Sequence, residues 1–294
     1  MNVPLKILVL GASGMLGSTL FNVLSKNSKF KVWGTVRNPE VLKYIKNLHN
    51  GIILTHVDVM NQDELIRIFY DVKPDVVINC IGIIKQQKVA EDPLTVIPIN
   101  SLLPHRLSSL CKLIGARLIL ISTDCVFDGK RGMYVESDPP NAIDLYGKSK
   151  ELGEIYNDKH VFTFRTSIIG HELNSQISLV NWFLSQQGIV RGFSKAIFSG
   201  FPANEIAEII ENKIIPNEDL FGLYHVSAEP ISKFDLLQLI KKLYGFDIEI
   251  KLEDDFEIDR SLNSEKFRKE TGYIPKKWDK LVQDMKDYRK EYLD

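Results

Sequence analysis

The amino-acid sequence predicts an α/β fold, in which a doubly wound parallel sheet is followed by a smaller mixed C-terminal domain. Short apolar segments alternate with amphipathic helical segments through the first half of the chain. The apolar segments are near-continuous runs of Ile, Val and Leu, as in parallel strands that are covered by helices on both faces. The second half loses this alternation, so we expect a different architecture there.

Six strands are expected in the first half, because each is a short apolar run bounded by turn residues or by a helical pattern. Their ranges are Lys6–Leu10, Lys31–Val36, Ile52–Val59, Val76–Cys80, Leu118–Ser122 and Phe162–Ile169. Apolar residues at helical spacing predict helices between them, over Met15–Leu24, Gln62–Asp71 and Leu102–Ile114. Right-handed crossovers through such helices place successive strands in one parallel sheet.

The sequence of the second half predicts three helices, over Leu179–Gln187, Asn204–Ile215 and Ile231–Tyr244. A charged tail is expected from Lys251 onward. We therefore expect a first domain over residues 1–170 and a second, mainly substrate-binding domain over residues 171–294. Some later segments are expected to return to the first domain. No Gly/Ser-rich linker separates the halves, so the two domains are expected to pack together.

The composition is that of an ordinary globular protein. Of 294 residues, 44% are hydrophobic and 26% charged, which excludes disorder, collagen and coiled coil as descriptions of the whole chain. The 37 Lys and Arg residues nearly balance the 38 Asp and Glu residues. A net charge of −1 gives no electrostatic reason to bind nucleic acid or an anionic membrane. No run approaches the roughly 20 apolar residues of a membrane helix.

The cysteines and histidines give no reason to expect a metal site. The three cysteines, Cys80, Cys111 and Cys125, are sparse, odd in number and without CxxC spacing. The six histidines form no HExxH pattern. The apolar run before residue 11 is too short for a signal-peptide core. These features predict a reducing, cytoplasmic setting and no protein-bound metal.

A glycine-rich turn, Gly11-Ala-Ser-Gly-Met-Leu-Gly17, joins the first strand to the first helix. Gly11 allows a tight turn, Gly14 lets the backbone approach a pyrophosphate, and Gly17 lets the helix pack close to the strand. The helix N-terminus then offers free N–H groups and a favourable dipole to the anion. This context predicts dinucleotide binding. The expected contacts are Gly11, Ser13, Gly14, Met15, Leu16 and Gly17.

Two side chains near the next strand ends bear on which dinucleotide is bound. Arg37 follows the second strand, where an acidic residue would hold the ribose 2′-hydroxyl of NAD and an arginine accommodates a 2′-phosphate. The arginine favours NADPH, with NADH as the alternative. Asp58, beside Val59 at the end of the third strand, is placed either to accept a hydrogen bond from the adenine amino group or to cap the helix that follows.

Tyr146 and Lys150 form a YxxxK pair, which brings a phenol and an ammonium onto one face of a helix. We expect the ammonium to lower the pKa of the tyrosine, so that it can give a proton to a carbonyl oxygen. The preceding strand ends in Ser122-Thr123, at the carboxyl edge where ligands bind α/β sheets. Thr123, Tyr146 and Lys150 are therefore the predicted catalytic group.

Together with Asn79-Cys-Ile-Gly82 and Asn100, these motifs resemble an extended short-chain dehydrogenase/reductase with a Rossmann sheet. The stretch Ser122-Thr-Asp-Cys-Val-Phe-Asp-Gly129 is similar to STDYVFDG of the dTDP-4-dehydrorhamnose reductase family. The late segment from Arg260 to Phe267 also resembles that family, although its usual Arg-Pro start is missing. The resemblance covers essentially the whole chain.

The resemblance implies reduction of the 4-keto group of a 6-deoxyhexose that is linked to a nucleoside diphosphate, and Arg37 favours NADPH as the reductant. The base stays open between dTDP and UDP, and so does an N-acetyl group on the sugar. The resemblance also implies that Cys80, Ile81 and Gly82 lie beside the cofactor and that Asn100 supports the active-site helix. It places Thr123, Asp124, Cys125 and Arg260 at the substrate, and such reductases are often homodimers. Lys85 follows the fourth strand at the same edge, where it either contacts the substrate or begins a solvated helix.

Cys125 stands where that family has tyrosine, and it is similar to a cysteine of GDP-fucose synthase, which epimerises carbons beside the ketone before reduction. That enzyme pairs the cysteine with a histidine after the sixth strand, and His171 is a candidate for this role here. A thiolate would take the proton and an imidazolium would return one. The alternative is that Cys125 packs as a small apolar residue and His171 bonds to the backbone.

Two further interpretations stay open. A redox-neutral epimerase or dehydratase of the same superfamily would use an acidic residue beside Thr123, and Asp124 stands there. Some relatives are regulatory subunits, of which the known case binds methionine adenosyltransferase. The presence of Thr123, Tyr146 and Lys150 favours an enzyme.

Overall fold

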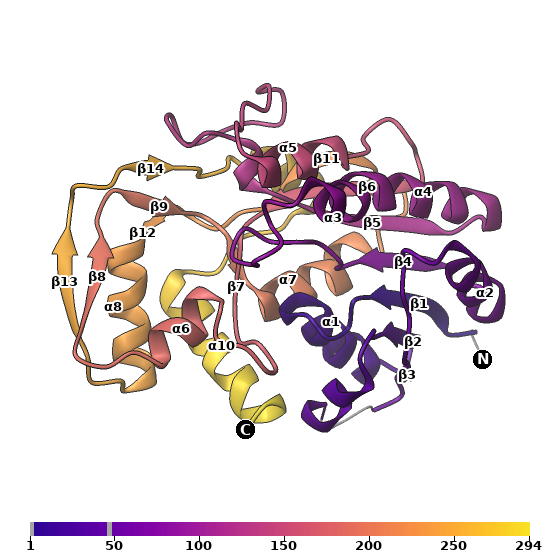
Figure 1. Ribbon diagram of the computed structural model, residues 1–294, viewed down its shortest axis with the longest axis horizontal. Coiled ribbons are helices and arrows are strands. Elements are labelled where there is room, and N and C mark those ends of the chain that lie inside the picture. The colour runs from indigo at the N-terminus through magenta and orange to yellow at the C-terminus, as the bar shows by residue number, and fades with distance from the viewer. Residues whose placement is uncertain (1–2, 46–48) are drawn as a thin grey trace.

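The computed structural model describes residues 3–45 and 49–294, and its core is a parallel sheet of seven strands in the order β11-β6-β5-β4-β1-β2-β3 (Figure 1). The strands are β1 (Leu5–Leu10), β2 (Phe30–Thr35), β3 (Ile52–Leu54), β4 (Val76–Asn79), β5 (Arg117–Thr123), β6 (Val161–Thr166) and β11 (Gly222–His225). The strand order reverses between β1 and β4. In doubly wound sheets a ligand crevice lies at that point, outside the carboxyl ends of the strands.

Helices cover both faces of this sheet, as the apolar runs predicted. Along β1, Ile7 and Val9 face a cluster with α1 (Met15–Lys26) and α7 (Ala203–Ile209). Leu8 and Leu10 face the opposite cluster. That cluster includes α2 (Gln62–Val72) and α4 (Leu103–Ile114). Successive side chains of a strand point to opposite faces, so a strand with no polar position is one that is buried on both.

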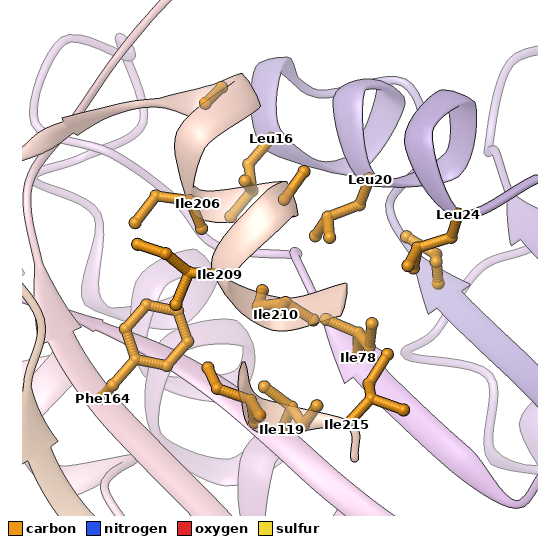
Figure 2. Close-up of a cluster of buried hydrophobic side chains, with 14 of the residues drawn as sticks. Leu16, Leu20, Leu24, Ile78, Ile119, Phe164, Ile206, Ile209, Ile210 and Ile215 are labelled. Carbon is orange, nitrogen blue, oxygen red and sulfur yellow. The ribbon is translucent and has the colours of Figure 1, made fainter. Parts of the chain in front are cut away.

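The contact between α1 and α7 forms the centre of the larger core (Figure 2). Leu16, Leu20 and Leu24 lie one turn apart along α1 and face Ile206 and Ile210. This four-residue spacing puts the leucines on one stripe of the helix. Because α7 begins at residue 203, a segment of the second half completes the core of the first.

Short helical segments connect the main elements. These are the 3₁₀ helices η1 (Pro39–Tyr44) and η3 (Asp124–Val126), the α-helices α3 (Pro93–Val96) and α5 (Leu145–Leu152), and the π-helical turns η2 (Ile97–Leu102) and η4 (Ile210–Ile214). Helix α5 begins where the Asp144 carboxylate accepts a hydrogen bond from the Gly147 N–H at 2.9 Å. No helix in the described ranges combines the length and apolar character that are needed to cross a bilayer.

The C-terminal unit holds a separate apolar cluster, which includes Phe183 and Leu236. Its elements are α6 (Leu179–Leu184), β8 (Ile189–Phe193), β9 (Ala196–Phe198), β12 (Ile231–Ser232), α8 (Lys233–Tyr244), β13 (Glu249–Glu253) and β14 (Ile258–Asp259). They form the small sheets β12-β9-β14 and β13-β8. A further pair, β7 (Ile168–Ile169) with β10 (Phe201–Pro202), follows the main sheet.

The chain ends in α9 (Glu265–Thr271) and α10 (Trp278–Tyr292), where a charged tail was expected. Helix α10 bridges the two units, since Leu281 packs in the core of the first and Val282 and Met285 pack in the core of the second. Helix α10 has few apolar residues, but they recur at helical spacing. The many charged residues between them made the segment resemble a charged tail in the sequence.

Several predicted boundaries were wrong. The third strand ends at Leu54 instead of Val59, because His56 takes a left-handed φ of 61° that strands do not accommodate. Asp58 therefore follows a turn. The segment Phe162–Ile169 is two strands, since β6 ends at Thr166 and β7 leaves the main sheet to pair with β10. Helix α8 begins at Lys233, because the two residues before it form β12.

Replacing Leu20 by Ala should destabilise the protein by about 2–5 kcal/mol, because the fully buried side chain leaves a cavity between α1 and α7. The measurement is urea unfolding followed by circular dichroism. Leu113→Ala is the matched control, since this leucine is 82% exposed on α4 and its loss should cost less than about 0.5 kcal/mol. Equal effects from both substitutions would contradict the described core.

Candidate functional site

The glycine turn after β1 leaves a helix N-terminus open to solvent. Helix α1 has Gly14 at its N-cap, with no side-chain cap and no acidic residue in its first turn. The N–H groups of Met15, Leu16 and Gly17 have no acceptor among the described residues. Ser13 and Gly14 are exposed beside them. Unpaired N–H groups at the positive end of a helix form a site for an anion.

Two glycines of this turn are required by geometry. Gly11 has a left-handed φ of 82°. A Cβ at Gly17 would lie 2.1 Å from the Gly11 carbonyl oxygen, so α1 approaches the turn more closely than any side chain allows. The turn is also held from β2, because Thr35 accepts from the Gly11 N–H through its hydroxyl and from the Ala12 N–H through its carbonyl. Thr35 was not singled out in the sequence, where nothing distinguishes it from other strand residues.

The residues expected at the adenosine end lie at neighbouring strand ends. Arg37 follows β2, is exposed, and forms no ion pair with the described residues. Asp58 is exposed after β3, and its carboxylate accepts from the Met60 N–H at 3.0 Å. The cap of α2 is Asn61, so Asp58 does not fill the capping role that was its alternative. Val59 is buried beside it.

Thr123 ends β5, while Tyr146 and Lys150 lie one turn apart on α5. The Lys150 ammonium donates to the Ile121 carbonyl at 2.8 Å, which holds α5 against β5. The Thr123 hydroxyl accepts from the Cys125 N–H at 3.1 Å and donates to the Asp124 carboxylate at 3.1 Å. Thr123 and Lys150 thus both lie at the end of β5, and Thr123 is near enough to Tyr146 to lower the pKa of its phenol by a hydrogen bond.

The charge states of this group differ from the expectation. Burial raises the pKa of Tyr146 well above its ordinary value, and Cys125 adds to the rise, so the expected lowering by Lys150 was wrong. Burial lowers the pKa of Lys150 to about 8, against the opposing effect of the Glu154 carboxylate. Near neutral pH the phenol therefore keeps its proton and the ammonium keeps its charge. A tyrosine in this state is able to donate a proton.

Asn100 connects the loop after β4 to the helix that carries Tyr146. Its amide oxygen accepts from the Ile83 N–H at 2.8 Å, and its amide nitrogen donates to the Ile83 carbonyl at 3.0 Å and to the Ser149 hydroxyl at 3.2 Å. Ile81 lies against the glycine turn, since its side chain would meet a Cβ at Gly11 at 2.8 Å. Burial raises the pKa of the nearby Cys80 thiol to about 12, so that it stays neutral.

Charged side chains gather around Asp124 and Cys125. Arg260 and Lys233 lower the pKa of the Asp124 carboxyl, although burial dominates and raises it overall. The Arg260 Nε donates to the Phe127 carbonyl at 2.8 Å, which anchors the side chain at the end of β5. Lys85 pairs with the Asp144 carboxylate at 2.8 Å, so it neither begins a helix nor stands free. Lys233, at the start of α8, was not expected from the sequence.

The segment after β5 is joined to a distant part of the chain. Asp259 N–H donates to the Gly129 carbonyl at 2.7 Å, Tyr134 N–H donates to the Ser261 carbonyl at 2.9 Å, and Asn263 N–H donates to the Tyr134 carbonyl at 2.8 Å. These hydrogen bonds join residues 129–134 to residues 259–263. The juxtaposition sets Arg260 beside the end of β5.

Cys125 and His171 are not joined by any hydrogen bond in the described chain. His171 is buried, and its ring nitrogens bond to Asn181 Oδ1 at 2.9 Å and to the Tyr244 hydroxyl at 2.8 Å. Burial lowers the pKa of His171 to about 4, which keeps the imidazole neutral. Burial, with Asp124 adding, raises the pKa of the Cys125 thiol to about 12. This state differs from the thiolate and imidazolium that epimerisation was expected to use.

A buried ion pair below the site was also missed. Arg165 on β6 and Glu154 after α5 are each 2% exposed, and the guanidinium bonds the carboxylate through two nitrogens, at 2.8 and 2.7 Å. The same carboxylate accepts from the Ser122 hydroxyl at 2.5 Å. One signal in the sequence was available, because an arginine inside an apolar strand must find a partner.

This fold and site define a protein of the short-chain dehydrogenase/reductase type, with an α/β sheet, an anion-binding turn and a Thr/Tyr/Lys group. Residues 5–289 match the model of the RmlD substrate binding domain, and the chain belongs to that family. The match covers both halves of the chain.

Curated relatives of two kinds are found. Methionine adenosyltransferase 2 subunit beta of Bos taurus is 27% identical over 207 residues, which are 69% of this chain and only 56% of that protein. The dTDP-4-dehydrorhamnose reductase of Aggregatibacter actinomycetemcomitans is 24% identical over 240 residues, covering 78% of this chain and 76% of that enzyme.

Solved structures agree on the fold. A hypothetical dTDP-4-dehydrorhamnose reductase from Sulfolobus tokodaii has a TM-score of 0.75 and 27% identity, covering 94% of this chain and 98% of that one. A dTDP-4-dehydrorhamnose reductase from Bacillus anthracis, solved in complex with NADP, has a TM-score of 0.80 at 19% identity, with 98% and 99% covered.

Replacing Gly14 by Ala should weaken dinucleotide binding at least about tenfold without changing Tm. The new Cβ meets only the Gly11 carbonyl oxygen at 3.6 Å, an ordinary contact, and the φ of −79° suits alanine. The methyl group would, however, stand at the open helix N-terminus where a pyrophosphate must approach. Calorimetric titration with NADPH measures the affinity. Unchanged affinity would show that this N-terminus does not hold the dinucleotide.

Proposed function

We propose that this chain is an NADPH-dependent reductase of the C4 ketone of a nucleoside-diphosphate 4-keto-6-deoxyhexose, linked to dTDP or UDP. The observation that carries the proposal is the Thr123, Tyr146 and Lys150 group at the sheet edge that also bears the open N-terminus of α1. Membership of the RmlD substrate binding domain family supports a sugar-nucleotide substrate. The role that follows is in deoxysugar and surface polysaccharide synthesis.

The residues fit a nicotinamide dinucleotide. The N–H groups of Met15, Leu16 and Gly17, which have no acceptor within the described ranges, would hold the pyrophosphate, and the exposed Arg37 would bind a 2′-phosphate. Arg37 thus favours NADPH over NADH, and the Bacillus anthracis relative was solved with NADP. When bound, the cofactor supplies the hydride that reduces the ketone.

The protein's own groups supply the proton and its position. As the carbonyl carbon gains the hydride, its oxygen becomes negative and takes the proton of the Tyr146 phenol, which yields the alcohol. The Thr123 hydroxyl stabilises the same oxygen by a hydrogen bond. The Lys150 ammonium, held against the Ile121 carbonyl, stabilises the phenolate that is left until a solvent proton replaces the one lost.

Positively charged residues near Asp124 and Cys125 are suited to bind the diphosphate of the sugar nucleotide. Among the residues that the structure describes, Arg260 is anchored only through Nε, so its terminal nitrogens are available for charge-assisted hydrogen bonds to a diphosphate. Lys85 and Lys233 add positive charge beside Asp124 and Cys125. We propose Lys85, Asp124, Cys125 and Arg260 as substrate contacts.

A second candidate function is that of a regulatory subunit. It is favoured by the matches to methionine adenosyltransferase 2 subunit beta, of which the bovine protein is aligned over 56% of its length. Against it stand the intact Tyr146 and Lys150, with the charge states that a reductase needs. Binding of a partner protein, together with no turnover of any keto sugar, would favour this alternative.

Wild-type protein should oxidise NADPH with one member of a panel of 4-keto-6-deoxy sugar nucleotides, made in place by dehydratases. The panel pairs dTDP and UDP carriers, with and without 2-N-acetyl groups and prior epimerisation. Tyr146→Phe should lower kcat at least about a thousandfold and leave NADPH affinity unchanged, because only the proton donor is lost. The loss of absorbance at 340 nm measures the rate of NADPH oxidation by the wild type and by the variant.

Tyr70→Phe is the control for that experiment, since this tyrosine is 72% exposed on α2 and its hydroxyl should not matter. Full activity of Tyr146→Phe would refute the assignment of the proton donor. If no member of the panel were reduced although NADPH binds, the proposed substrate class would be wrong.

The Cys125 and His171 hypothesis is tested by exchange with solvent. The Cys125 thiol is buried and neutral, and the neutral His171 imidazole is hydrogen-bonded at both ring nitrogens. Both states disfavour removal of a proton from a carbon beside the ketone. We therefore expect that a keto sugar formed beforehand in H₂O, freed of dehydratase and reduced in D₂O, gives a product without deuterium at C3 or C5 by mass spectrometry. Deuterium that is present with wild type and lost in Cys125→Ala, but kept in Cys111→Ala, would instead establish epimerisation before reduction.

A further inference from the structure

A chain of buried polar side chains runs beneath the catalytic group. Ser122 on β5 donates to Glu154, whose carboxylate is gripped from β6 by Arg165. The Arg165 Nη1 lies 3.4 Å from His225 Nε2 on β11. The other ring nitrogen, His225 Nδ1, is 2.9 Å from the Tyr134 carbonyl oxygen. Because a carbonyl only accepts, Nδ1 carries the proton and Nε2 accepts from the guanidinium.

One end of this series of hydrogen-bonded side chains lies next to the proposed reacting groups, so its position affects more than the packing of the core. Ser122 precedes Thr123, and the carbonyl that receives the Lys150 ammonium belongs to the residue before Ser122. Glu154 follows Lys150 by four residues, just beyond the end of α5. Moving the Glu154 carboxylate would therefore disturb both the end of β5 and the surroundings of Lys150.

Stability alone does not explain why this ion pair is buried. Both side chains are 2% exposed, and buried ion pairs often contribute less stability than apolar residues of the same volume. The guanidinium is also covered by the Phe127 ring, whose centroid lies 5.1 Å from it. The Phe127 ring and His225 therefore contact the Arg165 guanidinium in addition to the carboxylate, and these contacts restrict the position of the ion pair.

We propose that Glu154, clamped by Arg165, is a positioning residue of the catalytic centre, which fixes the end of β5 through Ser122 and serves as the counter-charge of the Lys150 ammonium. The inference rests on the proposed reductase function and assigns that site a residue outside its YxxxK motif. Glu154 does not touch the substrate, and it acts through Lys150 and Thr123.

The groups that face Lys150 make the sign of the effect clear. They are the Glu154 carboxylate and the Cys80 thiol at the end of β4, and the thiol is neutral near pH 8 because burial raises its pKa to about 12. His225 is neutral as well, since burial lowers its pKa to about 3. Glu154 thus opposes the effect of burial on the Lys150 pKa, while its carboxylate is also paired with Arg165. Without it, the ammonium should lose its proton at a lower pH.

The test is Glu154→Gln, which keeps the size of the side chain and removes its charge. The Lys150 pKa should fall by about one unit from its value near 8, and the alkaline limb of the kcat profile should move down by the same amount. KM should change less than about threefold. ¹⁵N-lysine NMR, assigned with Lys150→Met, follows the titration without any substrate.

Glu151→Gln is the matched control, because it removes a carboxylate charge from the last turn of α5, three residues before Glu154, and Glu151 is not among the groups that shift the Lys150 pKa. It should leave the Lys150 titration unchanged. A Glu154→Gln protein with an unshifted titration, or with an equal loss of kcat at every pH, would overturn the proposal.

If Glu154→Gln fails to fold because Arg165 is left unpaired, Glu154→Asp keeps the ion pair charged but draws the carboxylate back by one methylene group, and it is titrated in the same way. A lowered Lys150 pKa in that variant supports the proposal, and an unshifted one overturns it. If wild type reduces no keto sugar, the proposed function fails. The NMR titration still decides the role of Glu154, so the two failures are distinguishable.

Discussion

The close approach of α1 to the end of β1 is the constraint on which the rest of this structure depends. It exists only because Gly17 has no Cβ, and it aims an uncapped helix N-terminus at the point where the strand order reverses. The same approach brings the leucines of α1 onto α7, so the anion site and the largest core share one helix position (Figure 2). A shift of α1 would damage binding and packing together.

The catalytic edge combines polar groups that the interior would normally exclude. Burial holds the Tyr146 proton in place and weakens that of Lys150, and both effects arise from the same loss of solvent. A proton donor beside a cation that is only just charged is sensitive to every further charge nearby. The buried Glu154 and Arg165 pair is therefore best understood as part of the electrostatics of the site, in addition to its place in the core.

The sequence predicted the parallel sheet and the site motifs, because both depend on local patterns: apolar runs, a glycine turn and a YxxxK spacing. It failed where distant segments meet. Arg165, Lys233 and the partners of His171 become meaningful only once β6, α8 and α6 are folded around them. The expected lowering of the Tyr146 pKa was wrong for a similar reason, since a spacing argument contains no measure of burial. The boundary at residue 170 stays a prediction.

The hydrogen bonds between residues 129–134 and 259–263 have a consequence for the order in which the protein is completed. A ribosome releases the glycine turn and the first six strands of the main sheet well before Arg260 emerges. The side of the site that is proposed to hold a dinucleotide is thus encoded early, whereas the opposite wall waits for the last part of the chain. Loss of the chain from residue 259 onward would remove that wall and would also take away Phe267 and Leu281, which pack in the core that supports the glycine turn.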